Sequence, residues 1–386
     1  MKSNYRKLGD FIEQTEERNK DLAISLSQGI CNLKYFQNPR QVAENSSADK
    51  IVRTGWFAYN RATTRNGDKI SIAYRDKEDC TVSASYLTFK IKDENLLNPY
   101  YLMLWFKRPE FDRYARFKSH GSAHEYFEWE EMCDVMLPIP SIEEQRKIVA
   151  EYQAVEQRIE NNRRLIAKLE ETAQTIYRHM FVDNIDPENL PQGWRMGTIG
   201  EFCECNVDSY TSKDNWSIIN YLDSSSVTKN QFEDYIVLDP NINEIPSRAK
   251  RKVKENDFII STVRPNLKHY GLIKGDLSNV LVSTAFAVIR SINPYISNEL
   301  IYLWATSQES IDYLHNIAEM SKATYPSVIP EDILKIKVVL PPFDADFKAL
   351  NNQLKALFDF IYILNKEILF SNQLLSLLLS KLSKLN

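Results

Sequence analysis

The sequence predicts an α+β protein with an internal repeat, in which two α/β domains are separated by an antiparallel coiled coil of two long helices. Three observations support this prediction. Residues 141–182 carry a long heptad pattern, residues 343–386 carry a second one, and short motifs of the first half recur about 200 residues later. The 386 residues are enough for two hydrophobic cores plus connecting helices, and the repeat implies a pseudo-twofold arrangement.

The first heptad pattern predicts a helix over residues 141–182. Its seam positions alternate in spacings of four and three residues: Ile148, Tyr152, Val155, Ile159, Asn162, Ile166, Leu169, Ala173, Ile176 and Met180. A 3.5-residue repeat kept over this length turns one helix face toward a partner helix, which is typical of a coiled coil. The helix is expected to start at Ser141, because Pro138 and Pro140 precede it and Glu144 completes the spacing of a capping box.

The second heptad pattern supplies the partner helix. Its seam positions are Phe347, Leu350, Leu354, Leu357, Ile361, Leu364, Ile368, Ser371, Leu375, Leu378, Leu382 and Leu385. Adding 202 to each seam position from Ile148 to Met180 gives a seam position of this helix, which again follows a proline pair and has Asp344 as a candidate cap. The alternative is two ordinary amphipathic helices in one globular core, although such helices rarely keep so strict a seam.

Recurring motifs outside the helices predict that each half has the same α/β plan. The pairs are Leu8–Glu13 with Ile199–Glu204, Val52–Tyr59 with Val253–Ile260, the strand Thr81–Lys90 with the strand Leu281–Arg290, and Asn98-Pro99-Tyr100 with Asn293-Pro294-Tyr295, each of the last two ahead of a helical stretch. Because the second α/β segment lies between the two long helices, an antiparallel pairing needs no return of the chain along the first helix.

Composition limits the functional classes. The chain has 48 Lys and Arg against 52 Asp and Glu, a net charge of −4, whereas a protein that binds nucleic acid strongly by itself is usually basic. Any contact with DNA is therefore expected to need help from partners. We expect a soluble, cytoplasmic protein without membrane contact, because no apolar run of 18 residues and no signal-peptide core occur.

Several motifs in this order resemble the specificity subunits of Type I restriction-modification systems. Leu190-Pro191-Gln192-Gly193-Trp194, leading into Thr198–Phe202, is similar to the "LPxGW…LG" entry of that family's second target recognition domain. The proline-ended strands at 135–140 and 338–342 look like its entries into conserved helices, and Glu144-Gln145 with Ile148-Val149 matches its "EQ…IV" helix start. The second helix departs from the pattern, because residues 344–348 lack the Glu-Gln pair.

The resemblance implies a DNA reader that does not itself catalyse a reaction. It implies target recognition domain 1 at 1–140, a central conserved helix at 141–182, target recognition domain 2 at 183–342 and a C-terminal conserved helix at 343–386. Each recognition domain would read one half of a bipartite, asymmetric site in double-stranded DNA, and the coiled coil would set the spacer. The implied partners are two methyltransferase (modification) subunits and restriction/translocase subunits in a bacterial or archaeal cytoplasm. S-adenosylmethionine, ATP and Mg would bind to those partners and no cofactor to this chain.

Catalytic motifs are absent from the sequence. An adenine methyltransferase needs a glycine loop and an Asn/Asp-Pro-Pro-aromatic motif, but the ten glycines form no G-x-G and both Asn-Pro-Tyr motifs lack one proline, which favours helix entries. No P-loop, H-E-x-x-H or G-x-S-x-G occurs. His120 and His124 alone have a ligand-like spacing, and we expect no metal there.

Candidate DNA-binding residues are basic or amide side chains in matching segments of the two halves. They are Asn60, Arg61, Arg65, Lys69, Arg75, Lys118 and His120 in the first half, and Arg248, Lys250, Arg251, Lys252, Arg264, Lys268, His269 and Lys322 in the second. Arg and Lys bind phosphates, while Arg and Asn also read base edges. A solvated surface without DNA contact remains the alternative for each residue.

Two other functional classes stay open. A coiled-coil scaffold that spaces two protein-binding domains fits the seam and the acidic balance, and it predicts no DNA protection in any mixture of subunits. An enzyme of unrecognised type would need an acidic or nucleophilic cluster in both halves, and the sequence offers none.

Overall fold

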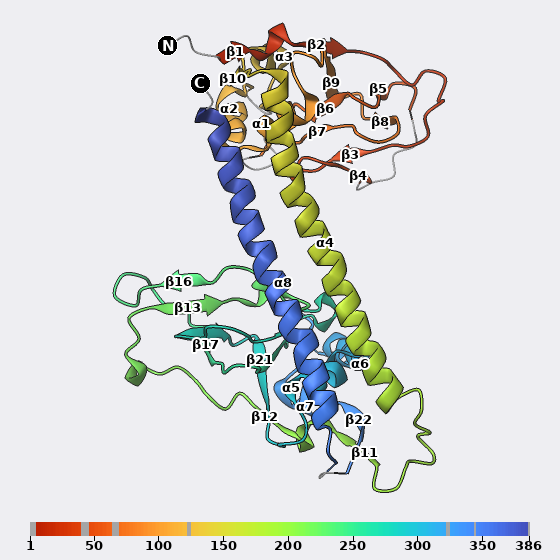
Figure 1. The fold of residues 1–386 in the computed structure, drawn as a ribbon, viewed down its shortest axis with the longest axis vertical. Coiled ribbons are helices and arrows are strands. Elements are labelled where there is room, and N and C mark those ends of the chain that lie inside the picture. The colour runs from red at the N-terminus through yellow and green to blue at the C-terminus, as the bar shows by residue number, and fades with distance from the viewer. Residues whose placement is uncertain are drawn as a thin grey trace. The chain divides into compact units, whose positions relative to one another are not determined.

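The computed structural model describes residues 5–39, 46–63, 69–121, 125–321, 325–342 and 345–384. The chain divides into two compact units: unit 1 is Met1–Arg158 with Ser371–Asn386, and unit 2 is Ile159–Phe370. Each unit combines a globular α/β part with a section of both long helices (Figure 1). Since the units cut across both helices, the four-segment domain division stays a prediction.

Unit 1 contains the first copy of the α/β plan. Its strands are β1 (Tyr5–Lys7), β2 (Ile12–Thr15), β3 (Gly29–Ile30), β4 (Phe36–Gln37), β5 (Lys50–Val52), β6 (Phe57–Asn60), β7 (Ile72–Tyr74), β8 (Cys80–Val82), β9 (Tyr86–Ile91) and β10 (Met136–Pro138). Its helices are the 3-10 turn η1 (Leu8–Asp10), α1 (Pro99–Lys107), α2 (Pro109–Lys118) and α3 (Trp129–Cys133), followed by the long helix α4 (Ile142–Phe181), which continues into unit 2.

Unit 2 contains the second copy and additional strands. Its strands are β11 (Arg195–Thr198), β12 (Cys203–Cys205), β13 (Ile219–Leu222), β14 (Val227–Thr228), β15 (Gln231–Phe232), β16 (Ile236–Leu238), β17 (Ala249–Lys252), β18 (Phe258–Ser261), β19 (Tyr270–Leu272), β20 (Val280–Ser283), β21 (Phe286–Ser291) and β22 (Lys337–Leu340). Its helices are η2 (Ile199–Glu201), η3 (Ser212–Asp214), η4 (Ser224–Ser226), η5 (Pro265–Leu267), α5 (Asn298–Thr306), α6 (Gln308–Met320) and α7 (Pro330–Leu334), and the long helix α8 (Lys348–Lys381) ends in η6 (Leu382–Lys384) in unit 1.

The predicted repeat is confirmed by the sheets. The central sheet of unit 1 has the strand order β2-β9-β6-β7, and that of unit 2 has the order β12-β21-β18-β19, with antiparallel neighbours in both. The short ladders β1·β10 and β11·β22 also correspond. Both copies begin with a glycine in η1 or η2 because the next helix approaches closely: a Cβ on Gly9 would lie 2.8 Å from Cys133 and one on Gly200 3.1 Å from Leu334.

Two local expectations need correction. The single strand expected over 81–90 is two strands, β8 and β9, because a turn closed by the Tyr86 N–H on the Ser83 carbonyl sends them into different sheets. Pro99 does start a helix, with the Asn98 side chain accepting from the Tyr101 N–H. In the second copy, however, Asn293-Pro294-Tyr295 forms a turn in which the Asn293 side chain accepts from the Tyr295 N–H, and α5 starts at Asn298.

The predicted long helices are present as α4 and α8. Ser141 caps α4 by accepting a hydrogen bond from the Glu144 N–H at 3.3 Å, and the Asn184 side chain donates to the His179 carbonyl at its end. The cap proposed for α8, Asp344, lies outside the described residues, and α8 starts later than predicted, with Asp346 accepting from the Lys348 N–H at 2.8 Å.

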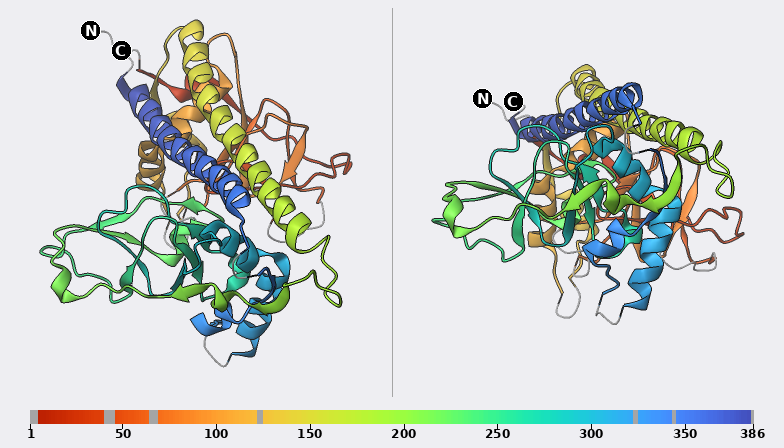
Figure 2. Two further views of the ribbon diagram at one scale, coloured as in Figure 1. Left: turned by 60° about the horizontal axis from the view of Figure 1, so that its bottom comes forward. Right: turned by 90° about the horizontal axis from the view of Figure 1, so that it is seen from below.

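The two helices pair in opposite directions within the units (Figures 1 and 2). In unit 2 the ring of Phe181, at the end of α4, lies 5.7 Å from that of Phe347, just before α8. In unit 1 Ile148, near the start of α4, lines a small cavity with Leu378 and Leu382, at the end of α8. Every described seam position of both helices is buried or half-buried, so the heptad reading is confirmed.

One seam position is polar. Asn162 is 5% exposed, and its side-chain amide donates to the Glu367 carboxylate of α8 at 3.0 Å. A buried amide in an apolar seam needs such a partner, because leaving it without a hydrogen bond costs about 1–3 kcal/mol. This pair therefore favours the one alignment of α4 and α8 in which the two side chains meet.

The hydrophobic cores belong to the separate units. Unit 1 has a core built around Phe57, Phe89 and Phe106, and unit 2 one around Phe202, Phe258 and Trp304, all almost fully buried. No helix among the described residues is long and apolar enough to span a membrane.

Candidate nucleic-acid interface

Each unit presents two neighbouring loops at the end of its central sheet. In unit 1 they are residues 61–69, after β6, and 119–127, between α2 and α3; in unit 2 they are 262–268, after β18, and 321–328, between α6 and α7. We call each set a loop pair. Residues 64–68, 122–124 and 322–324 of these loops lie outside the described residues.

The two loop pairs are joined by the same backbone hydrogen bonds. In unit 1 the Phe127 N–H donates to the Arg61 carbonyl and the Thr63 N–H to the Glu125 carbonyl, at 2.8 and 3.0 Å. A shift of 201 residues gives the bonds of unit 2, from Val328 to Thr262 and from Arg264 to Pro326, at 2.8 and 2.9 Å. The repeat therefore extends beyond the regular strands into these loops, where polar side chains are accessible.

In both loop pairs an arginine lies over a tyrosine ring. The guanidinium carbon of Arg61 is 5.0 Å from the centre of the Tyr126 ring, and that of Arg264 is 5.2 Å from the Tyr325 ring. Stacking on an aromatic face restricts a guanidinium without using its hydrogen-bond donors. Both arginines were candidates from the sequence, but their tyrosine partners were not.

Acidic side chains occupy the basic groups of the unit 1 loop pair. Arg61 pairs with Glu128 at 3.3 Å, while Lys118 and His120 share Glu131 at 3.2 and 3.4 Å. These are exposed or half-exposed pairs, which DNA phosphates could replace at little cost in stability. Asn60 uses its side-chain oxygen to accept from the Ala62 N–H at 3.1 Å, so it shapes the start of the loop.

A buried ion pair anchors the far end of the loop 61–69. The Asp112 carboxylate accepts from the buried Lys34 ammonium at 2.6 Å and from the Ile70 N–H at 3.2 Å. Burial lowers the pKa of Lys34, and attraction to Asp112 opposes this effect. Lys69, next to the anchored Ile70, is exposed and remains a candidate DNA contact.

In unit 2 two of the candidate basic residues of the run 248–252 are exposed beside the loop pair. Arg248 and Lys250 have exposed side chains. The Arg248 carbonyl accepts from the Thr284 N–H, and the adjoining Ala285 carbonyl accepts from the Thr262 N–H, both at 2.8 Å. These bonds bring the start of β17 to the same edge of unit 2 as the loop that carries Arg264.

The other two residues of that run face inward. Lys252 pairs with Asp214 and lies 5.4 Å from the Trp216 ring. Arg251 is half-buried, and its Nε has no hydrogen-bond partner among the described residues. Their partners therefore favour structural roles within the sheet β16-β13-β20-β17.

Two further candidates also have structural partners. Arg75 is 3% exposed; its guanidinium donates to the Glu78 carbonyl and to Gln28, and lies over the Phe36 ring. We therefore leave it out of the proposed interface, because a buried guanidinium has no surface to offer a phosphate. His269 contacts the Val227 carbonyl at 2.6 Å through Nδ1, while the neighbouring Lys268 is half-exposed.

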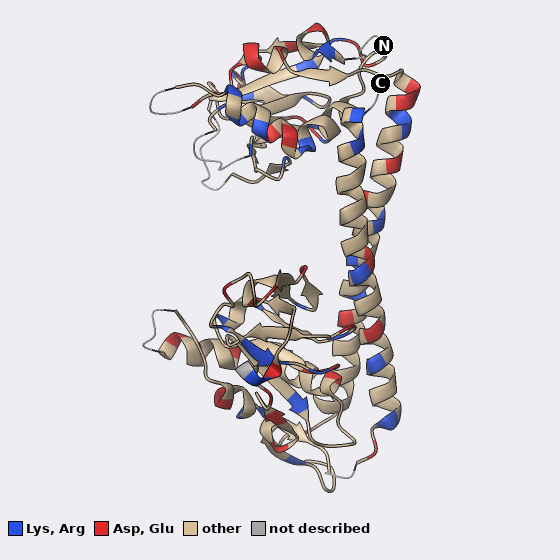
Figure 3. Ribbon diagram, turned by 90° about the vertical axis from the view of Figure 1, so that its left-hand side faces the viewer, with Lys and Arg blue, Asp and Glu red and all other residues tan. Residues whose placement is uncertain are grey.

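The remaining candidates and the metal question are quickly stated. Arg65 and Lys322 lie outside the described residues, as does His124 of the histidine pair. Among the residues that the structure describes, no group of three or more His, Cys, Asp or Glu side chains could hold a metal ion. In Figure 3 basic and acidic residues are interspersed over both globular parts, as expected for a net charge of −4.

Comparison with known proteins identifies the family. Residues 5–171 match the family model described as Type I restriction modification DNA specificity domain. Through these residues the chain belongs to the Type I restriction-modification specificity family. A curated relative, the Type I restriction enzyme HindI specificity subunit of Haemophilus influenzae, is 24% identical over 158 residues, which are 41% of this chain. The match spans only about a third, 34%, of that relative's length.

A solved structure extends the likeness in fold to the whole chain. The S subunit of a Type I restriction-modification system from M. genitalium superimposes with a TM-score of 0.56 over 98% of this chain and 94% of its own, at 14% identity. At this identity the likeness concerns the fold alone. The α+β fold with an internal repeat, two α/β parts and two antiparallel long helices is therefore the fold of this family's specificity subunits.

The sequence gave only a weak signal for the residues that shape the loops. Tyr325 lies in a loop that matched one in the first half, so its place was apparent, but its contact with Arg264 was not. The contact of Arg61 with Glu128 had no signal either, because 67 residues separate the two in the chain.

Proposed function

We propose that this protein is the DNA specificity subunit of a Type I restriction-modification complex and reads a bipartite, asymmetric DNA site. The main support is the repeated loop pair: two equivalent scaffolds carry loops joined by the same backbone hydrogen bonds but lined by different side chains. Two such scaffolds suit a site with two half-sites, and different side chains suit half-sites of unlike sequence.

In this proposal the paired helices α4 and α8 set the spacer between the half-sites. Their uninterrupted 3.5-residue seam supports a regular helix pair, in which inserting or deleting residues changes length and phase together. Target recognition domain 1, within residues 1–140, would read one half-site, and target recognition domain 2, within 183–342, the other.

The proposal assigns the chemistry to partner subunits. Two methyltransferase (modification) subunits would bind S-adenosylmethionine, and restriction/translocase subunits would use ATP and Mg, so this chain would need no cofactor of its own. The protein would act in the cytoplasm on double-stranded DNA. The net charge of −4 fits a subunit that gains DNA affinity from its partners.

Methylome sequencing tests the proposal directly. The chain is expressed with its cognate modification subunits in a strain free of other methyltransferases, and modified bases are mapped. We expect one bipartite motif to be methylated with both subunits and none with either alone. A coiled-coil scaffold without DNA contact predicts no methylated motif in any mixture, and methylation by this chain alone would contradict its non-catalytic role.

Exchange of one recognition domain separates the two half-sites. Replacing residues 1–140 with the matching segment of another family member should change one half-site and leave the other unchanged. Inserting four residues into α4 should change the spacer or prevent assembly, since the seam is shifted. An unchanged spacer in an assembled, active complex would count against the spacer role of the helices.

A further inference from the structure

The loop 262–268 contains a tight turn with two strained residues. Arg264 and Lys268 flank the 3-10 turn η5, and both have left-handed backbone conformations, with φ of 48° and 59°. Side chains other than glycine rarely adopt such angles unless surrounding contacts enforce them, and strained residues of this kind cluster at functional sites.

The surrounding contacts of the turn are specific. Within it the Leu267 N–H donates to the Arg264 carbonyl at 2.9 Å, and the Lys268 N–H to the Pro265 carbonyl at 3.0 Å. The Arg264 N–H is bound to the Pro326 carbonyl, and the Pro265 ring is buried. The backbone that carries Arg264 is thus fixed on both sides while its side chain stays exposed.

The Arg264 side chain is oriented without being neutralised. Its guanidinium lies over the Tyr325 ring, which is 59% exposed, and it forms no ion pair with any residue that the structure describes. Arg61, its counterpart in unit 1, stacks on a tyrosine as well but is paired with Glu128. Only Arg264 therefore combines a fixed backbone, an aromatic support and a full set of available donors.

We propose that Arg264 reads a guanine edge in the major groove of the half-site recognised by unit 2, with Tyr325 holding the guanidinium in place. This inference rests on the proposed function and adds to it a specificity-determining residue. A guanidinium can bond O6 and N7 of guanine through two parallel hydrogen bonds, a pairing that no other base offers, whereas a phosphate contact would not require a fixed orientation. The exposed Arg248 at the same edge of the unit suits a phosphate contact instead.

The test compares Arg264→Lys, Arg264→Gly and Arg248→Lys in the full complex with modification subunits. Arg264→Lys keeps the positive charge but loses the planar pair of donors. Arg264→Gly removes the side chain and at the same time relieves the left-handed backbone, so it should fold. Methylation rates are measured on oligonucleotides that vary each base pair of the wild-type site in turn.

We expect the wild-type complex to require a guanine at one position of one half-site. Both Arg264 variants should lose roughly 5- to 150-fold discrimination at that position and keep the sequence of the other half-site. Arg248→Lys should leave the base preference unchanged at every position. Tyr325→Ala should relax the same position as Arg264→Lys, whereas Tyr325→Phe should retain the preference.

Two results would overturn the inference and leave the proposed function intact. One is an Arg264→Lys complex that methylates the same bipartite site with unchanged base preference. The other is a loss of rate that is uniform over all base substitutions, which marks a phosphate contact. If the wild-type complex methylates no specific site, the proposed function itself fails.

Discussion

The two units attach to the long helices by different chemistry at positions that the repeat relates. Gln145 of α4 and Phe347, just before α8, are 202 residues apart. Gln145 has no exposed surface; its amide donates to the carbonyls of Leu96 and Pro140, both at 2.9 Å, and its oxygen accepts from the Asn98 N–H at 2.8 Å. In unit 2, Phe347 instead packs on the rings of the aromatic cluster at the end of α4.

A second pair of related positions repeats the contrast. Glu156 of α4 forms an ion pair with Lys107 at 2.7 Å, whereas Phe358 of α8, 202 residues later, packs edge-on against Tyr302 at 5.0 Å. The seam between the helices is thus preserved in the repeat, while the side that faces each globular part varies. Each attachment is satisfied locally, so polar and aromatic solutions are equally compatible with one scaffold.

The largest effect should come from Phe358. It is 2% exposed, and Phe358→Ala should lower the free energy of unfolding of unit 2 by about 3–5 kcal/mol. Its related position in unit 1 should matter much less, since Glu156→Ala removes a partly exposed ion pair worth up to about 1 kcal/mol. Urea denaturation measures both.

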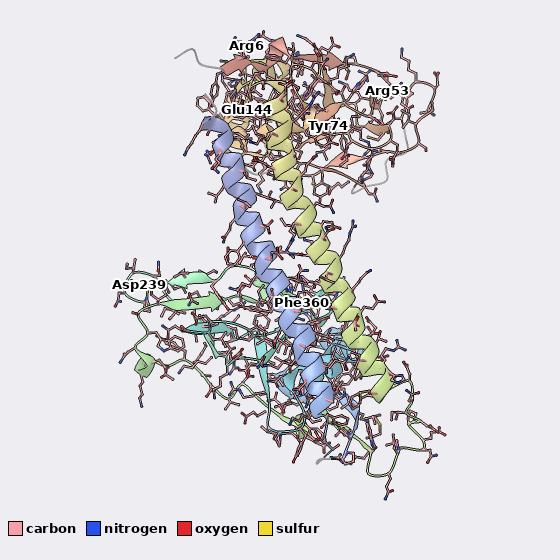
Figure 4. The ribbon with its side chains drawn as sticks, in the orientation of Figure 1. Arg6, Arg53, Tyr74, Glu144, Asp239 and Phe360 are labelled. Carbon is pink, nitrogen blue, oxygen red and sulfur yellow. The ribbon has the colours of Figure 1, made fainter. Side chains whose placement is uncertain are left out.

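Phe360 is a matched control on the same helix (Figure 4). It is 43% exposed, so Phe360→Ala should cost much less than Phe358→Ala. Equal losses from Phe358→Ala and Glu156→Ala would mean that the chemical contrast between the units has no energetic weight.

A smaller loss is expected at the first pair of positions. Gln145→Leu keeps the side-chain volume but leaves three buried backbone groups without their partner, which should cost about 2–4 kcal/mol. Phe347→Leu, at a half-buried position, should cost about 1 kcal/mol. Hydrogen exchange of the Asn98 amide provides a local readout, and unchanged protection in Gln145→Leu would contradict the role assigned to this glutamine.

A pH-dependent effect should distinguish a buried carboxyl in unit 2. Burial raises the pKa of Glu170 on α4 above its usual 4.5, against the opposing influences of Asn230 and Lys229. The folded protein therefore holds this proton more tightly than the unfolded chain, and stability falls as pH rises from about 4.5 through the folded-state pKa. Glu170→Gln should match the wild type at pH 4 and exceed its stability at pH 8.

The related position in unit 1 is a natural control for that experiment. Asn372 of α8 is exposed, so Asn372→Asp should introduce no comparable dependence on pH. Denaturation midpoints measured from pH 4 to pH 8 compare the variants. A constant difference between Glu170→Gln and wild type over this range would exclude a raised pKa at Glu170.

The smallest effect is expected in the unit 1 loop pair. Glu128→Gln releases Arg61 from an exposed ion pair, so stability should change by less than about 0.5 kcal/mol. In the assembled complex the variant should bind DNA a few-fold more tightly at low salt and equally at high salt, because a negative charge is removed from the interface. Filter binding over a range of salt concentrations checks this, and no change at low salt would separate Arg61 from the DNA.

Sequence reasoning predicted the scaffold because the scaffold repeats. The seam at a shift of 202 residues and the glycine motifs around Gly9 and Gly200 both reflect packing that both halves need. The sheet that joins β13 in parallel to β20 was not predicted, since it occurs in the second copy only and its strands are 58 residues apart at Asn220 and Ser278.

The candidate interface was predicted as a region better than as residues. The loops around Arg61 and Arg264 were selected correctly as equivalent places, because they follow equivalent strands. Whether an arginine there is available depends on distant partners: Arg75 is buried beneath Phe36, and Arg61 faces Glu128. Such pairings are made by the folded chain, and local composition does not reveal them.

The Asn162–Glu367 contact has a consequence for how the chain folds. The helices that it joins are 205 residues apart in sequence, so α4 is synthesised long before α8 and must later select one alignment among several that differ by whole heptads. Aliphatic seams tolerate such slippage, whereas an amide that meets no carboxylate does not. Replacing Asn162 with leucine would thus strengthen the adhesion of the helices and weaken their choice of partner position, trading fidelity of assembly for stability.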